Sequence, residues 1–173
     1  MLIRRERPGD VDAIRAVHLA AFVPFAPPGG TPVEAGLVDA LRADEGWLPR
    51  LSLVAESAEG EVVGHVVCTR AHVADVPVLG LGPLGVLPRV QRRGVGHALM
   101  HAVLAAADAL DEPLVVLLGH EDYYPRFGFR PAAEYGVVPK VPEWGAHFQA
   151  RALSAYRPDI RGLFRYAKPF EEL

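Results

Sequence analysis

The stretch "LGPLGVLPRVQRRGVG", residues 81–96, carries the most informative sequence pattern for the fold of this chain. It starts as an apolar, glycine-containing run typical of a strand, passes through a basic turn, and leads into the alanine-rich segment "HALMHAVLAAADAL". Val95, Leu99 and Val103 recur at helical spacing, which predicts a helix over residues 94–110. The apolar run "PLVVLL" then predicts a buried strand, so strand, helix and strand form a parallel, right-handed crossover.

The basic turn has the composition of an anion-binding site. Backbone N–H groups in the first turn of a helix have no partners within the helix, and the helix dipole adds positive charge there. Gly94 and Gly96 remove the Cβ atoms that would block these amides, while Gln91, Arg92 and Arg93 add donors. We therefore predict a pyrophosphate site, with a glycine-tightened turn carrying solvated arginines as the alternative.

The segments before this stretch alternate between helical and strand-like patterns. We expect a strand at residues 2–5, helices at 11–22 and 33–45, and strands at 51–57, 61–73 and 78–87. The turn "AEG" predicts that the strands at 51–57 and 61–73 form a hairpin. With the strand at 78–87, they are expected to form an antiparallel meander. The loop "VPFAPPGGTP" between the helices is too short to separate two domains.

The segments after residue 118 read as short aromatic strands separated by proline-containing turns. They show no second hydrophobic core, and the chain has no internal repeat or low-complexity tail. With 173 residues, half of them hydrophobic, the chain has enough apolar content for one substantial core. We therefore expect a single domain over residues 1–173.

Composition narrows the function classes. A formal charge of -3 with no sustained Lys/Arg run argues against a nucleic-acid partner. The single cysteine, Cys68, excludes an intramolecular disulfide, and its apolar surroundings favour a buried small hydrophobe. The first ten residues, "MLIRRERPGD", lack the apolar region of a signal peptide, and no run is long enough to span a bilayer. We expect a cytoplasmic protein with no membrane partner.

Three phosphate-binding patterns can be compared with the turn. A Walker A loop requires a Lys-Ser or Lys-Thr pair after its last glycine, and none follows here. A dinucleotide fingerprint requires G-x-G-x-x-G in a βαβ unit, whereas the third position here is Leu99 and the turn follows an antiparallel meander. The third pattern, Q/R-x-x-G-x-G/A, is satisfied by Gln91, Gly94 and Gly96.

This third pattern, with "LGVLP" directly before it, resembles the coenzyme-A pyrophosphate loop of the GNAT superfamily of N-acetyltransferases. The order of the expected elements resembles that family too, and "LGPLGVLPRVQRRGVG", "YYPRFGF" and "RYAKPF" resemble a bacterial branch of predicted acetyltransferases. The resemblance covers essentially the whole chain. It implies an α/β (α+β) fold in which about four helices flank a mixed central sheet of about six to seven strands.

The resemblance also implies where acetyl-CoA binds as co-substrate. Its pyrophosphate would rest on the amides of the basic turn, and its pantetheine arm would pair like an added strand with the end of the strand before it. That strand would splay away from "PLVVLL" to open the slot, and the amide of Val86 would donate to the thioester carbonyl. The implied cofactor-binding residues are Leu84, Gly85, Val86, Gln91, Arg92, Arg93, Gly94, Val95, Gly96 and His97.

A tyrosine is the implied general acid. Tyr124 matches the family's Y-x-x-x-G-F spacing with Gly128 and Phe129, and a phenol is suited to protonating a departing thiolate. Many family members also carry N-x-x-A-x-x-x-Y, but the position seven before Tyr124 is Leu117. The helix after the fifth strand is therefore expected to be short, and Tyr123 is a second candidate for the acid.

The general base has three candidates near strand ends: Glu56, His120 and Glu121. Glu34, on the second helix, is better placed to attract a cationic amine than to transfer a proton. His97 and His101 lie four apart on one helix, as in H-E-x-x-H, but no acidic residue lies between them. We expect no metal site.

These observations predict an acetyl-CoA-dependent N-acetyltransferase that moves an acetyl group to a primary amine by direct attack on the thioester. The alternatives are a non-catalytic acyl-CoA-binding module and, on G-x-G alone, a nucleotide-binding oxidoreductase. The acceptor stays open between small molecules and peptides, because the composition of a loop does not specify its ligand. An exposed edge strand in the C-terminal half would support a homodimer.

Overall fold

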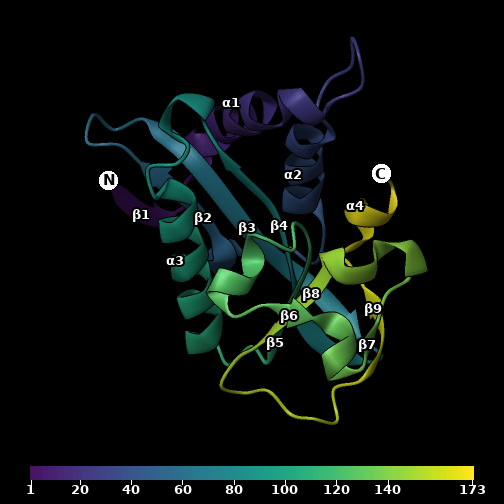
Figure 1. Cartoon of the computed structure of the whole chain (residues 1–173). Coiled ribbons are helices and arrows are strands. Elements are labelled where there is room, and N and C mark those ends of the chain that lie inside the picture. The colour runs from purple at the N-terminus through teal and green to yellow at the C-terminus, as the bar shows by residue number, and fades with distance from the viewer.

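The computed structural model describes all residues from Met1 to Leu173 as one central sheet with helices on both faces (Figure 1). The α-helices are α1 (Val11–Phe22), α2 (Val33–Ala43), α3 (Val95–Ala109) and α4 (Lys168–Glu171). The strands are β1 (Leu2–Arg5), β2 (Ser52–Glu56), β3 (Val62–Val73), β4 (Val76–Val86), β5 (Leu114–Leu118), β6 (Arg130–Pro131), β7 (Val137–Val138), β8 (Phe148–Ala152) and β9 (Gly162–Arg165). No helix combines the length and the apolar character needed to cross a bilayer.

The sheet is mixed, as the sequence predicts. Its main path runs β1-β2-β3-β4-β5-β8-β6, and β9 pairs with both β3 and β7. The strands β2 to β4 form the expected antiparallel meander, and β4, α3 and β5 form the expected parallel crossover. Strand β1 pairs antiparallel with β2, which the sequence did not predict. The strand number is nine rather than six or seven, because the C-terminal segments include two strands of only two residues each.

The two faces of the sheet are covered by different parts of the chain. Successive residues of a strand point to opposite faces, so Leu79 packs with the α3 residues Leu99 and Val103 while its neighbour Val78 packs into a second apolar cluster. Helix α1 lies on the second face, over β3 and β4, with α2 beside it. Cys68 is fully buried in the α3 cluster, where burial raises the pKa of its thiol, as expected for a small core residue.

The C-terminal third differs from the sequence-based expectation. Its aromatic residues do form an apolar cluster, in which Phe148, Ile160 and Phe164 pack on Val78 and its neighbours. The segment after β5 is one 3₁₀ turn, Tyr124–Phe127, rather than a helix. Gly128 ends that turn in a left-handed conformation with a φ of 87°. The fourth helix is instead α4, at the end of the chain.

Candidate active site

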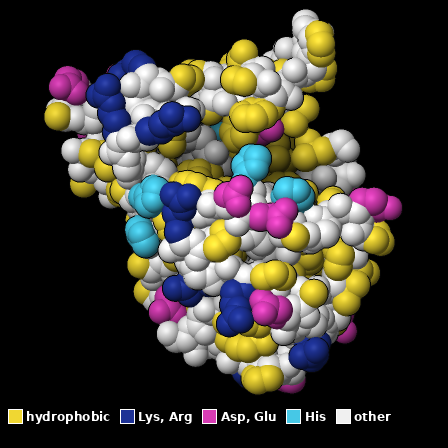
Figure 2. Space-filling model, viewed as in Figure 1, with side chains coloured by type: hydrophobic (Ala, Val, Ile, Leu, Met, Phe, Trp, Pro, Cys, Tyr) yellow, Lys and Arg dark blue, Asp and Glu magenta, His cyan; other side chains and the backbone are white.

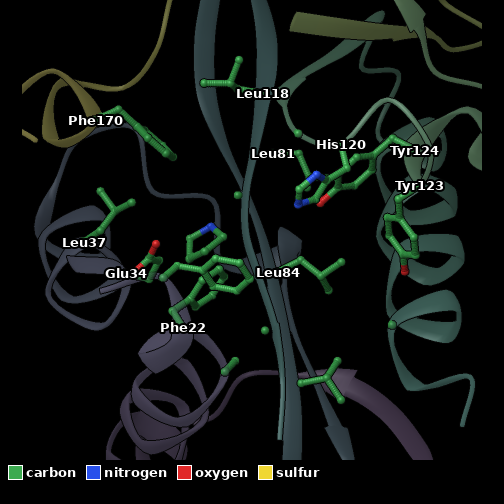
Figure 3. A pocket seen from close by; sticks show the side chains of 18 of the residues that line it. Phe22, Glu34, Leu37, Leu81, Leu84, Leu118, His120, Tyr123, Tyr124 and Phe170 are labelled. Carbon is green, nitrogen blue, oxygen red and sulfur yellow. The ribbon is translucent and has the colours of Figure 1, made fainter. Parts of the chain in front are cut away.

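The site is a cavity that opens where β4 and β5 diverge. These parallel strands pair at only two positions, ending with Gly80 opposite Val116. Beyond this point β4 carries an extra residue relative to β3, since Val66 pairs with Leu84 but Cys68 pairs with Leu81. The bulge bends β4 away from β5, and a cavity of about 1160 Å³ fills the gap (Figure 3). The splay expected from the glycine-containing strand is present.

One end of the cavity is the N-terminus of α3. Gly94 precedes the helix with a φ of 85°, and no side chain caps it. The first amide bonded within the helix is that of Ala98, which donates to the Gly94 carbonyl at 3.0 Å. The amides of Val95, Gly96 and His97 come before it and point out of the helix end, so this turn has the donors that an anion needs. Gly94, Gly96 and His97 line the cavity.

The long side chains of the turn are placed differently from one another. Arg92 lines the cavity, whereas Arg93 is exposed and does not. Gln91 also lines the cavity, but its Nε2 donates to the carbonyl of Val86 at 3.0 Å. Gln91 therefore braces the turn against the end of β4, in addition to any donor role.

The end of β4 presents its backbone to the cavity. The Leu87 N–H donates to the Val63 carbonyl of β3 at 2.9 Å. Alternate residues of a strand direct their N–H groups to opposite sides, so the amide of Val86 points away from β3, toward the side from which β5 has diverged. Leu84, Gly85 and Val86 all line the cavity.

The two tyrosines of "YYPRFGF" point to different parts of the cavity. Figure 3 shows the Tyr124 side chain pointing into the cavity, while the Tyr123 side chain extends toward α3. A Cβ on Gly96 would lie 2.9 Å from the Tyr123 hydroxyl oxygen. Burial, and then the neighbouring Tyr123, raises the pKa of Tyr124 to about 12. The Tyr124 hydroxyl is therefore protonated near neutral pH and can donate.

The structure places one of the three candidates for the general base in the cavity and two outside it. His120 lines the cavity. Glu121 lies outside it, with its carboxylate 3.9 Å from His147. Glu56 also lies outside it, on β2, where its carboxylate accepts a hydrogen bond from Arg4 Nε at 2.6 Å. The structure thus contradicts the prediction that Glu56 acts as the general base. The sequence pattern predicts the strand that carries Glu56, but it does not reveal the ion pair with Arg4 of the neighbouring strand β1.

The other half of the cavity is lined by side chains from distant segments. Phe22 is the last residue of α1, and Phe25 follows that helix. Trp144 precedes β8, and Phe170 belongs to α4. Glu34 of α2 points into the same space, between Phe22 and Leu37 in Figure 3. The sequence analysis predicted a role for Glu34, but Leu37 and Phe170 carry no local signal and are brought in by the packing of α2 and α4.

A buried polar chain connects β2, β3 and α1 and was missed by the sequence interpretation. The Ser52 hydroxyl donates to Glu6 at 2.5 Å, so it accepts from His65 Nε2 at 2.8 Å. His65 Nδ1 is then the acceptor for His18 Nε2, also at 2.8 Å. His18 is left with an unprotonated Nδ1 that has no partner. A Cβ on Gly85 would lie 2.7 Å from that nitrogen.

Burial keeps both histidines of this chain neutral. It lowers the pKa of His18 to about 3, with His65 adding to the effect, and it lowers the pKa of His65 as well. Burial alone would raise the pKa of Glu6, but contacts with His65, Arg42 and Ser52 outweigh it and lower this pKa to about 2. Two isolated histidines in the sequence therefore form a structural link between α1, β3 and the cavity strand.

The two histidines of α3, His97 and His101, pack against the ring of Phe127. The ring centroids of His97 and His101 each lie 5.2 Å from that of Phe127. No group of three His, Cys, Asp or Glu side chains is placed to hold a metal ion.

Comparisons with known proteins agree with this geometry. A family model described as an acetyltransferase (GNAT) domain matches residues 49–131. YjhQ of Escherichia coli K12, named an uncharacterized N-acetyltransferase, is 36% identical over 170 residues, which cover 94% of this chain and 90% of that protein.

Two solved structures are similar over nearly the whole chain. The GNAT family N-acetyltransferase YhbS from Escherichia coli, in complex with CoA, has a TM-score of 0.86 and 30% identity, covering 98% of this chain and 91% of that one. A GNAT family acetyltransferase from Brucella melitensis, in complex with acetyl-CoA, has a TM-score of 0.79 and 36% identity, covering 98% and 97%. The chain described here belongs to the GNAT superfamily and is an N-acetyltransferase.

Proposed function

We propose that this protein transfers the acetyl group of acetyl-CoA to a primary amine by direct attack of the amine on the thioester. One observation carries the proposal. A single cavity joins the uncapped N-terminus of α3, the open backbone edge of β4 and the hydroxyl of Tyr124. Two similar proteins are described with CoA or acetyl-CoA bound, which supports the same ligand here.

The donor half suits acetyl-CoA, which supplies the activated acetyl group when bound. The amides of Val95, Gly96 and His97, with Arg92 beside them, have the charge and spacing to hold the pyrophosphate. The open edge of β4 at Leu84–Val86 can pair with the amides of the pantetheine arm as a neighbouring strand would. The Val86 N–H then donates to the thioester oxygen and stabilises the negative charge that develops there during attack.

Two side chains are assigned to proton transfer. A protonated acceptor has no free electron pair, so it first loses one proton to solvent through His120. The amine then forms the carbon–nitrogen bond and the carbon–sulfur bond breaks. Tyr124 gives its proton to the departing sulfur and is reprotonated by the second proton of the acceptor nitrogen. His120→Ala should therefore lower kcat by about tenfold or more, and Glu121→Ala, outside the cavity, should leave it near the wild-type value.

Calorimetric titration with acetyl-CoA and a thiol-release assay with a panel of primary amines test the proposal together. We expect binding in the micromolar range and amine-dependent release of coenzyme A. Binding without release for any amine would indicate an acyl-CoA-binding module rather than an enzyme of this type. No binding at high micromolar acetyl-CoA would overturn the proposal, and affinity for NAD(P) instead would favour an oxidoreductase.

A further inference from the structure

The acceptor half of the cavity is mainly apolar and opens to solvent. Phe25 is 72% exposed and Leu173 is 68% exposed, yet both line the cavity. Leu118 and Val141 are exposed hydrophobic residues of the same lining. Figure 2 shows the corresponding hollow, where hydrophobic side chains gather on the surface. Exposed apolar residues grouped at a cavity mouth indicate a binding surface rather than incidental exposure.

The aromatic wall of this half is held in place by stacking. Phe22 stacks on His18 with ring centroids 5.9 Å apart, and Phe25 packs against Phe22 at 6.3 Å. His18 is itself fixed by the hydrogen bond to His65. On the opposite side, Phe170 stacks on Tyr166 at 4.4 Å. These contacts set the positions of the rings before any acceptor binds.

The charges in the cavity leave one carboxylate without a partner. Glu171 is paired with Lys140 at 2.7 Å. The Arg126 guanidinium donates to the backbone carbonyls of Asp122 and Tyr123. Glu34 makes no hydrogen bond or ion pair, although it is only partly exposed. A partly buried carboxylate flanked by apolar side chains is stabilised when a cation binds to it.

We propose that the acceptor is a hydrophobic primary amine, in which the ammonium binds Glu34 and an aromatic or alkyl group packs on the wall formed by Phe22, Phe25, Leu37, Trp144 and Phe170. This inference rests on the proposed acetyl transfer and adds the substrate class to it. A free amino acid is disfavoured, because its carboxylate would face Glu34. A polyamine is disfavoured too, because its second ammonium would lie against apolar side chains.

A matched set of amines tests the inference in the thiol-release assay. 2-Phenylethylamine should have a kcat/KM about tenfold or more above that of ethylamine, because the ring is removed from water. Phenylalanine carries the same ring and amine with an added carboxylate, and its kcat/KM should be lower than that of 2-phenylethylamine by about tenfold or more. Equal values for 2-phenylethylamine and phenylalanine, or a preference for spermidine, would overturn the inference.

Two variants locate the contacts. Glu34→Gln should raise the KM for 2-phenylethylamine about tenfold without changing the KM for acetyl-CoA, and it should reduce the discrimination against phenylalanine. Glu45→Gln removes an exposed carboxylate just after α2 and is the matched control. Phe25→Ala, at a side chain that is largely exposed, should affect 2-phenylethylamine more than ethylamine.

Calorimetric binding of 2-phenylethylamine to the CoA-loaded protein separates the two proposals. Binding that Glu34→Gln weakens about tenfold supports the inference even if turnover is slow. Turnover of other amines with no measurable binding of 2-phenylethylamine would overturn the substrate class and leave the acetyltransferase proposal standing. No binding of acetyl-CoA would count against the proposed function itself.

Discussion

The two halves of the cavity differ in whether backbone or side chains line them. The half proposed to bind acetyl-CoA, here called the donor half, presents mainly backbone: the edge of β4 and the first amides of α3, all within residues 84–97. The acceptor half consists of side chains from α1, α2, α4 and the segment before β8. A backbone site needs particular glycines at fixed spacing, whereas a side-chain site needs only a suitable surface. The donor half should therefore tolerate few changes, and the acceptor half should change specificity before it loses activity.

Gly96→Glu should have the largest effect, because it places a bulky anion among the amides expected to hold the pyrophosphate. We expect the affinity for acetyl-CoA to fall by about 100-fold or more, which corresponds to about 2.7 kcal/mol. Calorimetric titration measures it, and Gly36→Glu, at an open position of α2, is the matched helical control. Wild-type affinity in both variants would mean that this turn is not the donor site.

Tyr124→Phe should have the next largest effect. Loss of the proposed proton donor should lower kcat about 100-fold while the KM for acetyl-CoA changes little. Tyr123→Phe is the internal comparison, because its hydroxyl lies near Gly96 rather than in the centre of the cavity, and it should affect the KM for acetyl-CoA more than kcat. The reverse pattern would assign the acid to Tyr123.

Gly85→Ala tests the contact between the two halves. The new Cβ would lie 2.7 Å from His18 Nδ1, so β4 or α1 must shift, at a cost of about 1–3 kcal/mol. We expect a lower thermal midpoint and a KM for acetyl-CoA raised several-fold. The double variant Gly85→Ala with His18→Ala should recover part of the KM. A KM that is not recovered would show that the glycine matters for a reason other than His18.

Acid should lower the free energy of unfolding through the buried histidines, which lie behind the side-chain half of the cavity. The unfolded chain takes up a proton at His18 below about pH 6.5, whereas the folded pKa is about 3. Stability is therefore complete above this window and falls with decreasing pH between these values, by up to ~1.4 kcal/mol per pH unit.

Urea unfolding of His18→Gln at pH 7.0 and 5.0 measures how much His18 contributes to this loss of stability. The difference in unfolding free energy between the two pH values should be smaller in the variant than in the wild type. The same substitution at exposed His101 should leave the difference unchanged. An undiminished difference in His18→Gln would mean that His18 is not the group responsible.

The contrast between the two halves also explains what could be predicted from the sequence. Residues 2–118 have clear strand and helix periodicities, and their order and pairing are confirmed. The stretch proposed to bind acetyl-CoA could be singled out because its glycines and donors are contiguous. The prediction of Glu56 as the general base was wrong, because the sequence around a carboxylate at a strand end does not reveal its ion-pair partner, here Arg4 of β1.

The C-terminal third was harder to predict because its structure depends on long-range contacts. Short strands and 3₁₀ turns have little periodicity of their own, and Phe148 and Phe164 acquire their place only by packing on β4 and β5. Phe170 reaches the cavity for the same reason, through a helix of four residues. Positions defined by such contacts are not encoded in any local pattern.

A crystal structure of the protein with coenzyme A is the sharpest test of the proposed donor site. We predict the pyrophosphate on the amides of Val95–His97, the pantetheine arm along Leu84–Val86 in the gap between β4 and β5, and the sulfur within hydrogen-bonding distance of the Tyr124 hydroxyl. The apolar half beside Glu34 should remain free for the acceptor. Coenzyme A bound in that apolar half, or its sulfur directed away from Tyr124, would show that the proposed donor site is wrong.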